Sequence, residues 1–464
     1  MSDPVAELAQ IVPDGWLVGG TVRDRVLGRE TADFDVATAG SAAEIARALG
    51  QAAGGFAFEL SEAFGAWRIV AHDRTWQVDI LPLNGATIEE DLSRRDLTIN
   101  AIAAPLGAVG YVNPFGGLED LGARRLRAVS PVAFERDALR TLRLARLACE
   151  LGFDVDAATQ GLARAAAPRL AEVAPERVFA ELRRVVCAPA ALAGLELMDA
   201  IGVTDVVLPE LAALRGVEQS RFHHLDVSDH TRSVLAEVIA LERDPERLAG
   251  DEAPALMRFL AEPLANDLTR GQALRFGALL HDIAKPQTRS VTPQGRITFM
   301  GHDESGARLA TEILGRLRTS ERLRDHVAAL TRHHLRLGFL VHEMPLSRRA
   351  VYDYLHATAP VAVDVTVLSV ADRLATRGDN ADRAIAGHLE LARQMLAEGL
   401  AWIADPPRPP VRGDELAQAL GIKPGPVVGD LLAELEAASF SGEVATREEA
   451  IARARELIAS GPKD

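Results

Sequence analysis

The sequence predicts an α+β protein, with a small head of strands and helices in a mixed sheet, followed by a helical remainder. Strand-length apolar runs alternate with helix-length segments up to about residue 128. From about residue 131 onward, Ala, Leu and Arg recur at helical spacing to the end of the chain. With 464 residues the chain is too long for one core, and its length favours about three domains.

The elements of the head follow from its apolar runs and its turn residues. In chain order we expect a strand at 15–18, a helix at 21–27, a strand at 33–37, a helix at 41–49, and strands at 66–71 and 75–82. The last two strands are expected to form a hairpin around His72-Asp73-Arg74. The first strand ends at Gly19-Gly20, a turn that leads directly into the first helix.

Prolines and changes in composition divide the helical remainder. Helix breaks are expected at Pro168, Pro175, Pro189 and Pro209. The proline-rich stretch 406–410 reads as a stiff linker before a turn-rich segment and a last amphipathic helix near 446–459. We therefore expect four parts: a head (1–128), a helical neck (129–215), a histidine-rich domain (216–395) and a helical tail (396–464).

The charge of the chain is unevenly distributed. The formal net charge is −15, which taken alone argues against a nucleic-acid partner. Residues 121–150, however, hold seven arginines against three acidic residues, whereas residues 413–464 carry five basic and ten acidic side chains. A basic strip in the neck is therefore expected to support modest, salt-sensitive binding to phosphates.

The cysteines and the hydropathy pattern indicate a soluble, cytoplasmic protein. Cys149 and Cys187 both lie in apolar helical contexts, which is typical of reduced thiols and not of a disulfide framework. No apolar segment reaches the length of a membrane span, and no signal-peptide pattern is visible. The oligomeric state does not follow from the sequence.

The stretch 15–35 carries the first catalytic signal. Asp33 and Asp35 are separated by one residue, so on an extended strand both carboxylates share one face and can hold a divalent metal together. Gly19-Gly20 leaves backbone amides free at a helix start, where a triphosphate is favoured, and Arg23 adds a planar cation. This order of strand, Gly-Gly turn, helix and Asp-x-Asp outlines a nucleotidyl-transfer site.

These residues resemble the head of the class II nucleotidyltransferases, the family of bacterial CCA-adding enzymes and poly(A) polymerases. Three further blocks follow in family order: Arg94-Arg95-Asp96-Leu97-Thr98-Ile99-Asn100-Ala101, then Asp137 to Arg146, then Glu176 to Leu182. The resemblance covers residues 15–182. It implies template-independent addition of CCA to tRNA 3′ ends from CTP and ATP, with Mg²⁺ in the head.

The resemblance also implies roles for individual residues. Phosphoryl transfer needs positioned cations, about 3.5–4 Å apart in two-metal sites. Asp33 and Asp35 are the expected ligands, and Asp79 on a neighbouring strand could activate the attacking 3′-hydroxyl, although an outward charge on an edge strand would look the same in sequence. The resemblance assigns the nucleotide to Arg94, Arg95, Asp96 and Asn100, with Gly19, Gly20 and Arg23. Without the resemblance, Arg-Arg-Asp would also fit a charge cluster at the start of a helix.

Base choice is assigned to Asp137 and Arg140. They stand three apart on a predicted helix, so they should share one face. The carboxylate can accept from the exocyclic amine of cytosine or adenine while the guanidinium donates to the neighbouring ring acceptor, which would select CTP and ATP. Arg143 and Arg146 extend the strip toward triphosphate or the RNA end. A surface ion pair is the alternative for the Asp137 and Arg140 pattern.

Two departures from the family pattern keep other products open. Arg136 stands where the family usually has an acidic residue, and the span Ile80–Ser93 is shorter than the flexible loop of many full CCA-adding enzymes, which helps the switch from CTP to ATP. A CC-only or A-only tRNA nucleotidyltransferase, or a poly(A) polymerase, therefore remains an alternative.

A second site is predicted from eleven of the twelve histidines, which lie between residues 223 and 388. His230, His281-Asp282 and Asp372 follow the order of the HD phosphohydrolase superfamily, with Asp282-Ile-Ala-Lys285-Pro286 and Gly301-His302 in matching context. These four residues are expected to hold a divalent transition metal, and His302 with one of His333 and His334 a second metal or phosphate. Some family members with this domain act on RNA ends as phosphatases or 2′,3′-cyclic phosphodiesterases. If the head were degenerate, an HD phosphohydrolase with a nucleotide-binding head would be the alternative function.

Overall fold

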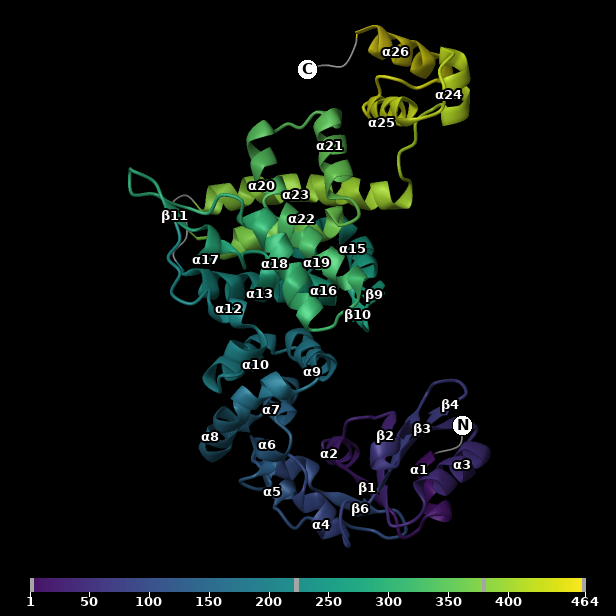
Figure 1. Cartoon of the computed structure of the whole chain (residues 1–464), viewed down its shortest axis with the longest axis vertical. Helices are drawn as coiled ribbons and strands as arrows, with labels where there is room; N and C mark the ends of the chain where they lie inside the picture. The colour runs from purple at the N-terminus through teal and green to yellow at the C-terminus, as the bar shows by residue number, and fades with distance from the viewer. Residues whose placement is uncertain (1–3, 221–224, 378–380, 461–464) are drawn as a thin grey trace. The chain divides into compact units, whose positions relative to one another are not determined.

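The computed structural model describes residues 4–220, 225–377 and 381–460 (Figure 1). The chain divides into two compact units, Met1–Val207 and Leu208–Asp464. The four-part division expected from the sequence stays a prediction. Its boundary at 215 lies close to the boundary between the two units.

The first unit begins with the head and continues into the helical neck. Its elements are α1 (Pro4–Ile11), β1 (Trp16–Val18), α2 (Gly20–Val26), β2 (Asp33–Thr38), α3 (Ala42–Ala53), β3 (Gly55–Ser61), η1 (Glu62–Phe64), β4 (Ala66–Ala71), β5 (Gln77–Pro82), α4 (Ile88–Ser93), η2 (Thr98–Asn100), β6 (Ala103–Pro105), α5 (Gly117–Gly122), β7 (Arg125–Leu126), α6 (Ala133–Arg136), α7 (Leu139–Leu151), β8 (Asp154–Val155), α8 (Ala157–Ala166), η3 (Ala167–Glu172), α9 (Pro175–Cys187), α10 (Ala191–Ala200) and α11 (Val203–Val207).

The head contains a six-stranded mixed sheet in the order β3-β4-β5-β2-β1-β6. β2 and β5 are parallel, and the other neighbouring strands are antiparallel. One face of the sheet is buried under α3, which in turn packs against α1 (Figure 1). Val36, Ile69, Val78 and Ile80 on that face are fully buried. The residues that alternate with them point to the opposite face, where the carboxylates lie.

The predicted α+β fold is confirmed, including all four predicted strands of the head, the hairpin between β4 and β5 and both predicted helices. Two strands escaped the sequence analysis. β6 has only three residues, Ala-Ala-Pro, which lack strand propensity. β3 was missed because its large apolar side chains face solvent and not the core. The helical remainder also contains three two-stranded pairs, β7 with β8, β9 with β10 and β11 with β12.

The second unit is mainly helical. Its elements are α12 (Pro209–Ala212), α13 (Val227–Arg243), α14 (Glu246–Ala249), η4 (Gly250–Glu252), α15 (Ala253–Leu260), β9 (Pro263–Ala265), β10 (Leu268–Thr269), α16 (Arg270–Leu280), α17 (Lys285–Thr288), β11 (Ser290–Val291), β12 (Ile297–Thr298), α18 (His302–Arg316), α19 (Glu321–His333), α20 (Arg336–Leu340), η5 (Val341–Glu343), α21 (Arg348–Thr358), α22 (Ala362–Ala375), α23 (Ala381–Ala404), α24 (Gly413–Leu420), α25 (Pro426–Phe440) and α26 (Arg447–Ser460).

The core of this unit forms where α13, α16, α19 and α22 pack together. The last three helices, yellow in Figure 1, enclose a small apolar cluster of their own that includes Leu416, Leu435 and Ala454. α26 confirms the last amphipathic helix predicted near 446–459. In the described part of the chain no single helix is long and apolar enough to cross a membrane. Only α21 and α22 taken together, bent by 98°, have that length and composition.

Candidate functional sites

Three carboxylates lie on the open face of the head sheet. Asp33 and Asp35 are two residues apart on β2, and Asp79 on β5 is the register partner of Asp35. Register partners and residues two apart share a face, so all three point to the same side. Asp79 lies on an interior strand, and Arg68 of β4 donates to both of its oxygens, at 2.6 and 2.7 Å.

The surroundings of Asp35 fit a cation. Burial raises the pKa of Asp35, and the negative charge of the nearby Asp79 raises it further. The Arg95 guanidinium lowers this pKa in part. Mutual repulsion of like charges is relieved when a cation lies between them. An all-oxygen donor set of this kind suits a hard divalent cation such as Mg²⁺.

Gly19 permits the close approach of the groups around these carboxylates. It has φ +66°, and a Cβ placed there would lie 2.9 Å from Nη1 of Arg95 and 3.3 Å from Oδ2 of Asp35. The next residues of the turn support β2, because the Thr21 hydroxyl accepts from the Asp35 N–H at 2.8 Å and donates to the Asp33 carbonyl. The Gly-Gly turn is therefore part of the wall of the carboxylate site.

Arg23, on α2, is anchored to the second predicted block. It pairs with Asp24 at 2.8 Å, and its Nη1 donates to Oδ1 of Asn100 at 2.9 Å. The Asn100 amide donates in turn to Asp96 at 3.0 Å. These side chains connect the helix after the Gly-Gly turn to the segment 94–100.

Asp96 is a buried acceptor that holds Arg143 of α7. Its carboxylate accepts from the Leu97 N–H at 2.7 Å and lies 2.9 Å from Nε of Arg143. Burial alone would raise the pKa of Asp96, but Arg143, the Asn100 hydrogen bond and the Leu97 N–H outweigh it and lower the pKa to about 2. Asp96 is therefore ionised at neutral pH and positions Arg143.

The predicted base-selecting pair has a different geometry from the one expected. Asp137 does not lie on a helix: it has extended backbone between α6 and α7, and its Oδ1 accepts from the Leu139 N–H. Short acidic side chains favour this capping position, which the helical spacing alone did not reveal. The other oxygen pairs with Arg177 at 2.8 Å. The prediction of one helical face is thus wrong, and Asp137 bonds to α9.

Arg140 is held by main-chain oxygens. Its guanidinium donates to the carbonyls of Arg94, Arg95 and Ala133, at 2.8 to 3.2 Å. These bonds fix the plane of the guanidinium and join α7 to the segment that carries Arg94 and Arg95. Arg95 itself pairs with Asp91 at 2.9 Å.

Arg146 lies apart from these residues. It is 4% exposed and pairs with Glu150 at 2.8 Å and with Glu181 of α9 at 2.5 Å. Its guanidinium faces these two carboxylates within the neck. The structure thus brings Asp33, Asp35, Asp79, Gly19 and Arg95 together, but not Arg146.

A hollow of about 490 Å³ adjoins this arrangement. It is lined by Phe64, Leu81, Pro82, Leu83, Asn84, Asp91, Arg94, Arg95 and Arg140. Leu81 is two residues after Asp79 on β5, so the hollow lies on the carboxylate side of the sheet. Cationic groups and apolar surface meet there, as a nucleotide requires.

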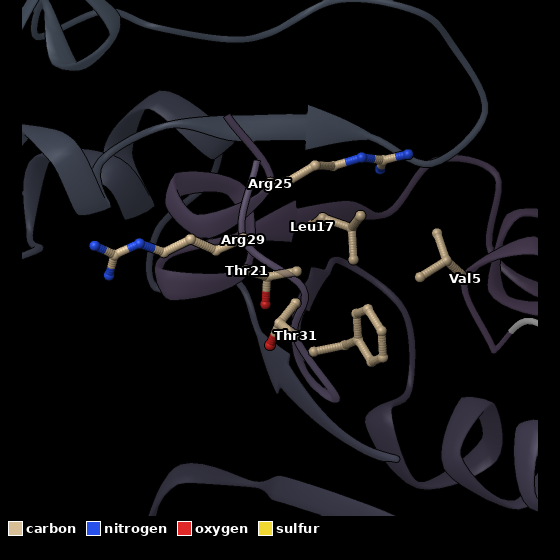
Figure 2. A pocket seen from close by; sticks show the side chains of 7 residues that line it. Val5, Leu17, Thr21, Arg25, Arg29 and Thr31 are labelled. Atoms are coloured by element: carbon tan, nitrogen blue, oxygen red, sulfur yellow. The ribbon is translucent and has the colours of Figure 1, made fainter. Parts of the chain in front are cut away.

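A smaller hollow of about 280 Å³ lies beside the start of β2. Figure 2 shows Thr21 and Thr31 within it, while the side chains of Arg25 and Arg29 extend in different directions. These two guanidinium groups therefore do not form one anion clamp.

The second unit brings together the predicted HD residues. His230 comes from α13, His281 and Asp282 follow α16, and Asp372 lies on α22. Nε2 of His230 lies 3.0 Å from Asp372, and Nε2 of His281 lies 3.1 Å from Asp282. His230, His281 and Asp282 offer ligand atoms within 4.8 Å of one another.

A second group shares Asp282. Its members are Asp282, His302 and His334, also within 4.8 Å, so the prediction of one of His333 and His334 resolves to His334. The Nδ1 atoms of three rings donate to main-chain carbonyls: His281 to Ala278 at 2.9 Å, His302 to Phe299 at 2.7 Å and His334 to Thr331 at 2.7 Å. Each Nε2 is therefore left to face a carboxylate of the cluster and to serve as the ligand atom, an arrangement typical of metal-binding histidine.

Charges around Asp282 keep it ionised. Burial opposes ionisation, but His281 and Lys285 hold the pKa of Asp282 well below its usual range. Lys285 lies 2.6 Å from this carboxylate and donates to Gln219. Burial lowers the pKa of His334 to about 4, which leaves that ring neutral for a metal.

The remaining histidines serve other contacts or lie elsewhere. His326 lies 3.7 Å from Asp364, His356 stacks on Tyr352, and His388 bonds to Ser369. His223 and His224 lie outside the described residues.

Three family models match the chain in sequence: a poly A polymerase head domain over residues 15–127, a probable RNA- and SrmB-binding site of polymerase A over 152–214, and an HD domain over 252–377. An A-adding tRNA nucleotidyltransferase of Deinococcus radiodurans is 36% identical over 444 residues, 94% of each chain. The chain belongs to the tRNA nucleotidyltransferase family. The resemblance inferred from the sequence blocks is confirmed.

A further relative and a solved structure support the same family and fold. A CC-adding enzyme of Thermus thermophilus is 36% identical over 467 residues, 97% of this chain and 96% of the relative. Among solved structures, a CCA-adding enzyme in an apo form superposes with a TM-score of 0.68 at 18% identity, over 100% of this chain and 97% of that one, which shows the shared fold. Nucleotidyltransferase and HD families are metal-dependent, and the chain has side-chain groups that fit such ions.

Proposed function

We propose that this enzyme adds CCA to tRNA 3′ ends from CTP and ATP, with Mg²⁺ held by Asp33 and Asp35. The observation that carries the proposal is the placement of Asp33, Asp35 and Asp79 on one face of the sheet, beside Gly19 and Arg95. When bound, the metal would stabilise the attacking and leaving oxygens of the transfer.

Asp79 is the proposed acceptor for the proton of the attacking 3′-hydroxyl. Its bidentate pair with Arg68 orients both oxygens and occupies one acceptor site on each, so each oxygen keeps a second site for the hydroxyl. A base of this kind works only within hydrogen-bond reach of its proton. Arg68 therefore acts as the positioning residue of this carboxylate.

The nucleotide is proposed to bind in the hollow that Arg94, Arg95 and Arg140 line. Planar guanidinium groups suit triphosphate oxygens and ring acceptors. The phosphate side of this hollow is proposed to be formed by Gly19, Gly20 and Arg23. The residues around it are held in place by the contacts among Asp96, Asn100 and Arg143.

Base choice is proposed to depend on Asp137 with Arg140. Asp137 can exchange its Arg177 partner for an exocyclic amine, because that ion pair is partly exposed and therefore weak. Arg140 keeps a fixed plane through its three carbonyl acceptors. Arg146 is proposed to act by positioning, since its ion pair with Glu181 fixes α7 against α9.

A CC-only enzyme is the second candidate for the head. Relatives that match 94% or more of this chain include one A-adding and two CC-adding enzymes, whereas a multifunctional CCA protein of Halorhodospira halophila matches 68% of it. The connection between β5 and α4 is also short, since β5 ends at Pro82 and α4 begins at Ile88. No long loop is therefore present there to reshape the nucleotide site after CC addition.

For the second unit we propose a divalent transition metal held by His230, His281, Asp282 and Asp372, with His302 and His334 completing the site. Mixed imidazole and carboxylate donors favour such a metal. Hydrolysis of phosphate at RNA ends, including 2′,3′-cyclic phosphates, is the activity that this site supports. A head that only binds nucleotide is disfavoured by its intact carboxylates. Because tRNA is the substrate, we place the enzyme in the cytoplasm.

The test uses purified protein and three tRNA transcripts that end before CCA, after C and after CC. Each is incubated with labelled CTP, ATP, UTP or GTP alone and in mixture. Addition of CCA supports the first candidate, and a stop after CC supports the second. Asp33→Ala and Asp35→Ala should reduce incorporation by several orders of magnitude without loss of folding. Near-normal incorporation by either variant would refute the metal assignment.

A further inference from the structure

The edge strand of the head sheet exposes a row of large apolar side chains. Phe56, Phe58 and Leu60 alternate along β3, with exposed fractions of 66%, 45% and 42%. Isolated exposed apolar residues are common, but a contiguous row usually marks a binding surface. The residues between them belong to the side of the sheet that α3 covers.

The strand register places this row on the same face as the carboxylates. Phe58 pairs with Arg68, Arg68 pairs with Asp79, and Asp79 pairs with Asp35. Register partners share a face, so these four side chains form one line across the sheet. The line runs from an exposed aromatic ring to a metal-binding carboxylate.

A second line runs parallel to the first. Phe56 pairs with Val70, Val70 with Gln77, and Gln77 with Asp33. The Phe56 ring also contacts His72 edge-on, with ring centroids 4.4 Å apart. Each of the two expected metal ligands is therefore in line with one phenylalanine of β3.

From these lines we propose that Phe56 and Phe58 form a stacking platform for the unpaired bases at the 3′ end of the RNA substrate. Single-stranded bases stack on exposed aromatic side chains, including those on open sheets. This inference rests on the proposed function, because it takes the RNA end to be the acceptor at Asp79.

The dimensions suit this role. Neighbouring strands lie about 4.8 Å apart, so three spacings separate Phe58 from Asp35 by about 14 Å. A few nucleotides stacked at about 3.4 Å each cover that distance. Arg68 lies along this path and supplies a cation beside the platform for the sugar-phosphate backbone.

A second copy of this chain is a poorer occupant of the same strand. Pairing of two edge strands needs a regular ladder, and the register of β3 shifts between Glu59 and Ser61. The exposed Glu59 side chain adds a charge to this edge. Stacking of bases uses the face of the sheet and does not depend on the irregular edge.

The test compares Phe58→Ala and Phe58→Tyr with the full-length protein. Steady-state addition is measured with varied tRNA at saturating CTP, and with varied CTP at saturating tRNA. Phe58→Ala should raise KM for tRNA about tenfold, the loss expected for one stacked base, and leave KM for CTP unchanged. Phe58→Tyr, which keeps the ring, should restore KM for tRNA. Val109→Ala, at a fully exposed apolar position in the same head, is the matched control.

A direct probe of stacking is an acceptor-stem RNA with 2-aminopurine in its unpaired 3′ segment. Its fluorescence should be quenched on binding to the wild type and to Phe58→Tyr, but not to Phe58→Ala. Equal KM for tRNA and equal quenching in all proteins would overturn the platform. So would a change in oligomeric state of Phe58→Ala on size-exclusion chromatography without a change in KM. If the wild type binds this RNA but adds no nucleotide, the proposed function fails and not the platform.

Discussion

The substitution Gly19→Ala tests whether the Gly-Gly turn is part of the catalytic wall. Gly19 has φ +66° and ψ −133°, a backbone region that only glycine adopts readily, so alanine should cost about 1–3 kcal/mol of stability. The added Cβ would also lie 2.9 Å from Nη1 of Arg95, closer than real Cβ contacts allow. Arg95 would have to shift by about half an ångström to restore an ordinary contact.

This shift should affect catalysis beyond the loss of stability. A charge-assisted hydrogen bond contributes about 1.5–3 kcal/mol, so a displaced Arg95 that no longer reaches the nucleotide should lower kcat/KM by about 10- to 150-fold. The measurement is single-nucleotide addition to a tRNA lacking its 3′ end, together with thermal unfolding of the same protein.

Gly28→Ala is the matched control. Gly28 has φ +68°, but a Cβ there would meet no atom within 4 Å. Its alanine variant should therefore lose about 1–2 kcal/mol of stability and keep normal kcat/KM. If Gly19→Ala loses stability but keeps full activity, the contact with Arg95 does not matter to the reaction and the reasoning is refuted.

Four further predictions follow from the same geometry. Asp137→Ala should incorporate UTP or GTP measurably, because a hydrogen-bonding site rejects wrong bases by leaving groups unpaired; unchanged selectivity would reduce Asp137 to an ion pair with Arg177. The double variant His281→Ala, Asp282→Ala should lose bound transition metal and any phosphohydrolase activity but retain nucleotide addition, and equal metal content by elemental analysis would contradict the assignment. The pKa of Asp96 is lowered from 3.8 to about 2 on folding, so the ionised carboxylate stabilises the fold by about 2 kcal/mol above about pH 4. This stabilisation should disappear as the pH falls from about 4 to 2, and urea unfolding of wild type and Asp96→Asn across this range measures it. Burial raises the pKa of the Cys149 thiol to about 12, so its thiolate fraction at pH 8 is about 10⁻⁴ and it should resist a thiol reagent that labels it fully in urea.

The sequence predicted the elements whose pattern matches their environment. In β2, β4 and β5 the large, fully buried apolar residues face α3 and the charged residues face the open side, so period-two alternation located them. β3 reverses this logic, because its aromatic residues face solvent. A strand whose large side chains serve binding instead of packing cannot be recognised by a rule that equates apolar with buried.

The sequence predicted which residue types form the candidate sites, but not which of these residues contact each other. The HD order of histidines and aspartates located the candidate metal-binding cluster because ligand chemistry restricts the residues that can serve. The choice between His333 and His334 needed the structure, since adjacent residues on a helix point in different directions. The ion pair between Arg68 and Asp79 could likewise not be predicted from the sequence, because it depends on the register between β4 and β5.

The sequence blocks of the first unit mix residues proposed to meet the substrate with residues that pair with another block. The ion pairs of this unit explain that mixture. Asp96 holds Arg143, and Arg140 holds the carbonyls of the segment 94–95, so the second and third blocks fix each other. Blocks three and four do the same through Asp137 with Arg177, and through Arg146 with Glu181.

A spacing pattern records that these side chains must be present, but not whether each meets the substrate or another motif residue. Arg146 is the clearest case, because its basic character predicted a phosphate contact and its burial gives it two carboxylate partners instead. Buried ion pairs contribute little net stability, yet breaking one is costly because the remaining charge is left unpaired. Replacing such a residue should therefore displace α7 against α9 and alter nucleotide addition indirectly, whereas replacing Arg95 should act at the hollow itself.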